Sequence, residues 1–137
     1  MRILVIDGQG GRMGSLLVEQ LKEAGKEISI TAVGTNSIAT AAMLKAGADF
    51  GATGENPVIV GCKRADIIAG PVGIVLANAL LGEVTPRMAQ AVAESEAFKV
   101  LIPVNRCGHY IVGIKEGTMA EYVKMAADAV LRRVQET

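Results

Sequence analysis

Short apolar runs alternate along the chain with longer amphipathic stretches, and this alternation predicts strands and helices in turn. The run over residues 2–7 is rich in β-branched side chains and stops at a cluster of glycines, which is typical of a buried strand. Over 12–24, apolar side chains form one broad stripe and charged ones face away, so we expect a helix that ends at Gly25. A second apolar run over 28–33 completes a β-α-β unit.

The same alternation continues to the end of the chain. Asn36 or Ser37 is expected to cap the next helix, and proline after Asn56 or Thr85 is typical of a helix start. Residues 58–60 fit a strand as well as a helix. The remaining expected elements are strands over 49–52, 66–70 and 99–104, a candidate sixth strand over 110–114, and helices over 38–45, 57–64, 72–81, from Thr85-Pro86, and over 118–134.

This order of elements predicts one α/β domain of the Rossmann type over residues 1–137, with an open, mostly parallel sheet and helices on both faces. Half of the 137 residues are hydrophobic and only 3% are aromatic, a composition that suits parallel strands buried on both faces. Because so much apolar side chain sits on a small surface, we expect a homo-oligomer. The apolar stretch 67–81 contains glycines and a proline, so we interpret it as strand, turn and helix rather than a membrane span.

The charge and cysteine content limit the partners, the compartment and the metal sites that we expect for this chain. Fourteen basic and fourteen acidic side chains give a net charge of zero, so no long-range field attracts nucleic acid or an anionic membrane. Two cysteines are too few for a disulfide framework, and no signal pattern opens the chain, so we expect a cytoplasmic protein. Cys107-Gly108-His109 supplies too few ligands for a tetrahedral metal site, and we expect no metal.

The richest candidate site is the segment Asp7-Gly8-Gln9-Gly10-Gly11-Arg12-Met13-Gly14, between the first strand and the first helix. The start of a helix offers unpaired N–H donors, and its dipole favours an anion. In such a loop Gly8 suits the tight turn, Gly10 or Gly11 lets phosphate oxygens approach the backbone, and Gly14 lets helix and strand pack closely. The spacing fits a loose G-x-x-G-x-x-G rather than the strict dinucleotide fingerprint.

Within this segment, Gly10-Gly11-Arg12-Met13-Gly14 resembles the glycine loop of dihydrodipicolinate reductases, which are NAD(P)-dependent enzymes. The resemblance implies that Gly8, Gly11, Arg12 and Met13 lie along the diphosphate and adenosine half of a dinucleotide, with Arg12 as a partner for a 2′-phosphate. The chain departs from that family in having a single histidine, His109, and an aspartate at position 7. A carboxylate there repels a diphosphate unless a metal intervenes, or else accepts hydrogen bonds from the loop amides.

Over its whole length the chain resembles a family of small bacterial proteins of unknown function, which implies no activity. The resemblance is carried by Ile6-Asp7-Gly8-Gln9-Gly10-Gly11, by Gly47-Ala48-Asp49 with Gly54-Glu55-Asn56, by Gly70-Pro71-Val72-Gly73, and by Ile102-Pro103-Val104-Asn105.

The end of the second strand bears on the choice of nucleotide. NAD-binding sheets place an acid there for the adenosine ribose, whereas this chain has Gly34-Thr35-Asn36-Ser37. The hydroxyl and amide groups of Thr35 and Asn36 suit a phosphate better than a ribose diol, which favours NADP. The alternative is that Asn36 and Ser37 only cap the next helix.

Ligands of open parallel sheets bind outside the carboxyl ends of the strands, near the switch point. Gly70, Pro71, Gly73 and Asn105 are expected at that edge. Glu83 is a further candidate carboxylate there, and the alternative is that it is only a solvated loop acid. We therefore expect a nucleotide-binding protein whose ligand is NADP or another adenine nucleotide. Two alternatives stay open: a small enzyme with Asp7, Asn105 or His109 at its reacting centre, and a non-enzymatic oligomeric sensor or partner without a nucleotide.

Overall fold

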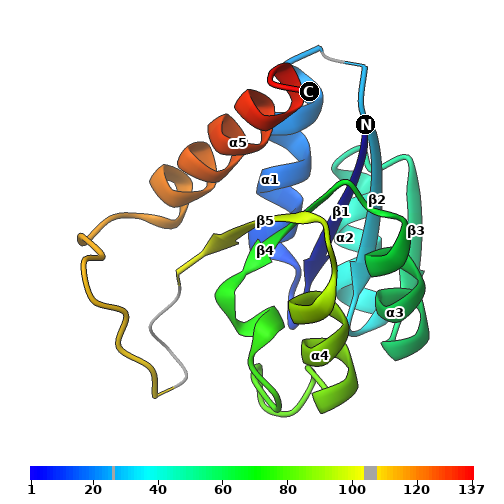
Figure 1. Ribbon diagram of the computed structural model, residues 1–137, viewed down its shortest axis with the longest axis vertical. Coiled ribbons are helices and arrows are strands. Elements are labelled where there is room, and N and C mark those ends of the chain that lie inside the picture. Colours follow the sequence, from blue (N-terminus) through cyan, green and yellow to red (C-terminus); the bar gives the residue numbers. More distant parts are fainter. Residues whose placement is uncertain (26, 104–107) are drawn as a thin grey trace.

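The computed structural model describes residues 1–25, 27–103 and 108–137, and it confirms the predicted α/β architecture (Figure 1). Five strands form one sheet in the order β3-β2-β1-β4-β5, and every neighbouring pair is parallel. The strands are β1 (Arg2–Asp7), β2 (Ser29–Gly34), β3 (Phe50–Thr53), β4 (Ile67–Pro71) and β5 (Phe98–Ile102). The helices are α1 (Arg12–Glu23), α2 (Ser37–Lys45), α3 (Glu55–Arg64), α4 (Pro86–Glu94) and α5 (Met119–Gln135), with a 3₁₀ helix, η1 (Val72–Val75).

The strand order creates a switch point between β1 and β4. From β1 the chain moves outward through β2 to β3, then returns to place β4 on the opposite side of β1 and continues outward to β5. The loops that follow β1 and β4 therefore leave the sheet in opposite directions and open a crevice between them. This crevice is the place where an open parallel sheet binds its ligand.

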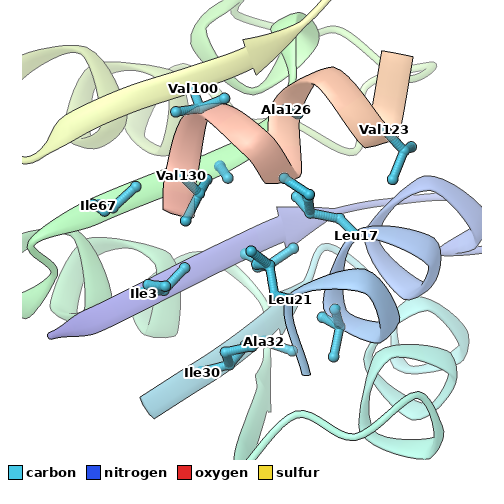
Figure 2. Packing of buried hydrophobic residues seen from close by; sticks show 14 of the residues in the cluster. Ile3, Leu17, Leu21, Ile30, Ala32, Ile67, Val100, Val123, Ala126 and Val130 are labelled. Atoms are coloured by element: carbon cyan, nitrogen blue, oxygen red, sulfur yellow. The ribbon is translucent and has the colours of Figure 1, made fainter. Parts of the chain in front are cut away.

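Both faces of the sheet are covered, as the apolar strands predict. Side chains of β1 alternate, so Ile3 and Val5 lie on one face while Leu4 and Ile6 lie on the other. The first face packs against α1 and α5, where Leu17 is fully buried against the strands (Figure 2). The second face packs against α3, η1 and α4. This burial fixes the carboxyl ends of the strands, and with them the loops that form the site.

Three local predictions about helix starts and types are confirmed. The stretch 57–64 is helical and belongs to α3, so the strand alternative is wrong. Asn36 caps α2 through its side-chain oxygen, which accepts a hydrogen bond from the Ala39 amide at 2.9 Å. Thr85 caps α4 in the same way, with its hydroxyl oxygen 3.1 Å from the Met88 amide.

The predicted helix over 72–81 is wrong. The chain makes only the short η1 and then a series of turns, in which Asn78, Leu80 and Leu81 have φ angles of 67°, 57° and 57°. Such left-handed residues cannot continue a right-handed helix. The amide of Asn78 instead donates to the carbonyl of Val84 at 2.7 Å and closes the turn. We call residues 76–84 the β4–α4 loop.

The candidate sixth strand over 110–114 is also wrong. Those residues belong to an extended stretch, 108–118, that has neither helix nor strand and leads into α5 (Figure 1). β5 remains the edge of the sheet.

Candidate functional site

A cleft of about 1020 Å³ lies at the carboxyl ends of β1, β4 and β5. The switch point between β1 and β4 lies at this cleft. The glycine loop, residues 8–13, lines one side, together with Pro71 at the end of β4 and Gly73 in η1. The β4–α4 loop contributes Leu76, Leu80 and Leu81, and the far side is formed by Ile102, Pro103, Ile114, Lys115, Glu116, Gly117, Met119 and Tyr122. The volume and the mixed apolar and polar lining fit a small-molecule site.

Asp7, at the end of β1, holds the glycine loop in shape. Its Oδ1 accepts a hydrogen bond from the Gly8 amide at 2.8 Å, and its Oδ2 accepts one from the Gly14 amide at 2.7 Å. Burial raises the pKa of this carboxyl, the two amides oppose that rise, and nearby Glu83 adds to it. The alternative in which Asp7 accepts hydrogen bonds from the loop amides is therefore confirmed, and a direct contact with a ligand stays a prediction.

The glycines of the loop serve different purposes. A Cβ on Gly11 would lie 2.7 Å from the Ala39 Cα, so this residue, with φ at 72°, lets α1 approach α2. A Cβ on Gly14 would lie 2.9 Å from the Asp7 Cβ and clash with Met43, which confirms its predicted role in close helix–strand packing. Gly10 alone among the loop glycines has open space where a Cβ would be. Among the glycines of the loop, Gly10 is therefore the one whose surroundings leave room for an approaching group.

Three backbone amides of the loop indicate a candidate anion site. Within residues 1–25, 27–103 and 108–137, no acceptor is hydrogen-bonded to the N–H groups of Gly10, Arg12 or Met13. All three residues line the cleft. The amides of Arg12 and Met13 belong to the first turn of α1, where the helix dipole is positive. The charged side chains of the lining are two cations, Arg12 and Lys115, and two acids, Asp7 and Glu116.

On the β2 side of the loop, Thr35 and Asn36, which the sequence suggested as phosphate ligands, instead donate hydrogen bonds to Glu83. Its Oε1 accepts hydrogen bonds from the Thr35 hydroxyl at 2.6 Å, the Asn36 side-chain amide at 2.8 Å and the Gln9 backbone amide at 2.9 Å. Desolvation opposes ionisation, but these three donors outweigh it and lower the pKa of the Glu83 carboxyl. Of the two alternatives for Glu83, the one of a merely solvated loop acid is wrong, because the β4–α4 loop turns the side chain back toward the end of β2.

Comparison with protein families matches residues 2–135 to the domain of unknown function DUF3842. The chain belongs to the DUF3842 family. This confirms the predicted membership of a family of unknown function, and no curated protein matches the chain. Neither result tests the likeness of the glycine loop to dihydrodipicolinate reductases, which stays an interpretation.

Among solved structures, the DUF3842 chain is similar to a dodecameric FMN-dependent UbiX-like decarboxylase from Escherichia coli O157:H7. The TM-score is 0.54 at 17% sequence identity, with 98% of this chain and 95% of the other covered. At that identity the likeness shows a common Rossmann-like fold, and the fold is one that binds a nucleotide-type cofactor in the neighbour.

The other predicted site residues of the DUF3842 chain fall into three groups. Pro71 and Gly73 line the cleft beside the glycine loop. Gly70 lies within β4, where a Cβ would collide with the Ile6 carbonyl oxygen, so it serves strand pairing rather than the cleft. Asn105 and Cys107 lie outside the described residues, and His109 is exposed. In the part of the chain that the structure describes, no three His, Cys, Asp or Glu side chains are grouped to hold a metal.

Sequence reasoning missed the far wall of the cleft. Residues 114–117 and Tyr122 line the cleft together with the glycine loop, and Gly117 packs so closely on Tyr122 that a Cβ there would lie 3.3 Å from the ring. The signal available in the sequence was the apolar stretch 110–114, shortly before Thr118, the N-cap of α5. Its pattern predicts a strand rather than a wall of the cleft.

The DUF3842 chain has a second hollow, of about 910 Å³, at the amino ends of the strands. Its lining mixes basic and acidic side chains: Arg2, Lys63, Arg64, Arg87 and Arg133 with Asp66, Glu94 and Glu96. Open parallel sheets bind ligands at the opposite end, so the glycine-loop cleft is the better candidate. Among the described residues, no helix combines the length and apolar character that a membrane span requires.

Proposed function

We propose that this protein binds a nucleotide-type ligand in the cleft, with a phosphate group on the amides of Gly10, Arg12 and Met13. The observation that carries the proposal is the set of three amides that line the cleft with no hydrogen-bonded acceptor among the described residues. A phosphate accepts several N–H bonds at once at the start of a helix. Because the chain has no net charge, the anion must be attracted locally, and the amides and dipole at the start of α1 supply that attraction, with Arg12 at the same place.

The remainder of the cleft supports a ligand with a flat, largely apolar ring. Leu76, Leu80 and Ile102 provide an apolar wall, and Tyr122 offers an aromatic face. Flavin mononucleotide is the first ligand to test, since the structural neighbour is FMN-dependent. NADP is the second, because it is the nucleotide that the sequence favours, although Thr35 and Asn36 bind Glu83 in the structure.

We also propose that the protein is a homo-oligomer. Tyr110 and Val112, in the stretch before α5, are 84% and 83% exposed, and Leu81 at the cleft mouth is 96% exposed. Apolar side chains with this much exposure favour burial in an interface with another copy of the chain. The dodecameric state of the neighbour is consistent with assembly.

Calorimetric titration tests the proposed ligand class. FMN, AMP and NADP are titrated into the protein at fixed salt, together with the variants Gly10→Asp and Gly10→Asn. Both variants place a side chain of equal size in open space, but only the aspartate adds a negative charge beside the amides. At least one nucleotide should bind, and Gly10→Asp should weaken it about tenfold more than Gly10→Asn does. Absence of binding by all three at millimolar concentration would overturn the proposal.

A further inference from the structure

The β2 side of the glycine loop contains a small anion site that the chain fills with its own carboxylate. Three donors from two segments converge on one oxygen of Glu83: the backbone amide of Gln9, the hydroxyl of Thr35 and the side-chain amide of Asn36, all within 2.9 Å. Asn36 is held in place from a second direction, because its Nδ2 also donates to the Gln9 carbonyl at 2.9 Å. Donors fixed in this way would bind any anion of suitable size placed at the same point.

The position of this cluster matters for nucleotide choice. Thr35 and Asn36 directly follow β2, and in dinucleotide-binding sheets the end of this strand holds the adenosine ribose or its 2′-phosphate. Here the β4–α4 loop covers that position. A Cβ on Gly8 would lie 2.8 Å from Leu80 Cδ1 and 3.0 Å from Glu83 Oε1, so no ligand can pass between Gly8 and this loop.

The described lining of the cleft agrees with this closure. It comes from the glycine loop, from the residues after β4 and β5, and from the start of α5, and it includes neither Thr35 nor Asn36. A ligand whose phosphate lies on the amides of Arg12 and Met13 can therefore extend toward β4 and β5, but not toward β2. Any second phosphate directed to β2 would also meet the negative charge of Glu83.

We propose that Glu83 is a specificity-determining residue: its carboxylate occupies a latent 2′-phosphate site and restricts the cleft to mononucleotides. The inference rests on the proposed function and names the ligand class that the same cleft accepts. Removal of the side chain frees the donors of Gln9, Thr35 and Asn36. Those donors should then favour a dinucleotide that carries a 2′-phosphate over one that does not.

The experiment compares NADP with NAD, which differ only in the 2′-phosphate, and uses FMN and AMP as mononucleotides. Kd values are measured for the unmodified protein, for Glu83→Ala and Glu83→Gln, and for Glu19→Ala, which removes an exposed acid from α1. The unmodified protein should bind a mononucleotide at least about tenfold more tightly than either dinucleotide. In Glu83→Ala the affinity for NADP relative to NAD should rise about tenfold, the factor that one charge-assisted hydrogen bond supplies, whereas Glu19→Ala should leave that ratio unchanged.

Glu83→Gln keeps the shape and an acceptor oxygen but removes the charge, so it reports on selectivity even where the alanine variant fails to fold. It should raise the NADP-to-NAD ratio by a smaller factor of about three. An unchanged ratio in the folded Glu83 variants would overturn the inference, as would equal affinity of the unmodified protein for NADP and a mononucleotide; the proposed function would stand in both cases. Absence of binding by every nucleotide would overturn the proposed function, and the inference with it.

Discussion

The carboxylate of Asp7 accepts a hydrogen bond from the backbone amide of Gly14 at 2.7 Å and thereby ties the end of β1 to the first turn of α1. The first turn of a helix has several N–H groups without partners inside the helix. Asp7 takes one of them, whereas the amides of Arg12 and Met13, two residues that line the cleft, have no acceptor among the described residues. One amide of this helix start thus binds an internal carboxylate, and two are available to the proposed ligand.

Replacement of Asp7 by alanine should lower the free energy of unfolding by about 1–3 kcal/mol, because the Gly8 and Gly14 amides lose their acceptor in a buried setting. Asp7→Asn should have an intermediate effect, since its oxygen can accept from one amide while its NH₂ group faces the other. Urea denaturation of the three proteins measures the difference. An alanine variant as stable as the unmodified protein would show that the loop does not need this carboxylate.

Gly14→Ala should destabilise the fold by about 1–3 kcal/mol, because the added methyl would clash with Met43 and lie 2.9 Å from the Asp7 Cβ. Gly10→Ala is the matched control in the same loop, since a Cβ there meets nothing within 4 Å. Thermal unfolding of both variants should separate them clearly. Equal midpoints would contradict the assignment of Gly14 to packing and Gly10 to open space.

The stability difference between the unmodified protein and Glu83→Gln should depend on pH. The three donors lower the pKa of Glu83 in the folded state, so the carboxylate stabilises the fold above its ordinary value of 4.5. This contribution is lost as the pH falls through the lowered pKa, and the glutamine variant cannot titrate. Urea denaturation between pH 7 and pH 3 should therefore show the largest difference at neutral pH and a shrinking one in acid. A constant difference would mean that the Glu83 carboxylate has the same pKa in the folded and unfolded protein.

Light scattering should give a mass above that of one chain, and the double variant Tyr110→Ser, Val112→Ser should shift the protein toward the monomer. The reason is that both side chains are more than four-fifths exposed in the isolated chain. Met125→Ser is the control, since Met125 is also exposed but belongs to α5 rather than to that stretch. A monomeric mass for the unmodified protein would contradict the proposed assembly.

The fold could be predicted from the sequence because its strands and helices have regular periods. Residues 3–6 form a short apolar run that ends at glycines, as expected of a strand buried on both faces, and the apolar stripe of α1 repeats at helical spacing. The helix predicted over 72–81 is wrong, because apolar composition does not distinguish a helix from turns in which leucines have left-handed φ angles.

The candidate site could be predicted only in part. The glycine loop lies between adjacent elements, so its position follows from local sequence. The Glu83 cluster does not, because Glu83 is separated from Thr35 by 48 residues and meets it only through the unexpected turn of the β4–α4 loop. The two alternatives for Asp7 likewise differed by which atoms its carboxylate contacts, and only distances decide that.

Backbone NMR during a titration with FMN tests the central claim most directly, because it reports which amides meet the phosphate. The resonances of Gly10, Arg12 and Met13 should move most, whereas the amides of Gln9 and Gly14, already held by Glu83 and Asp7, should move less. Inorganic phosphate should move the same three resonances at higher concentration. Shifts confined to the hollow at the amino ends of the strands, or no shifts in the glycine loop, would contradict the account.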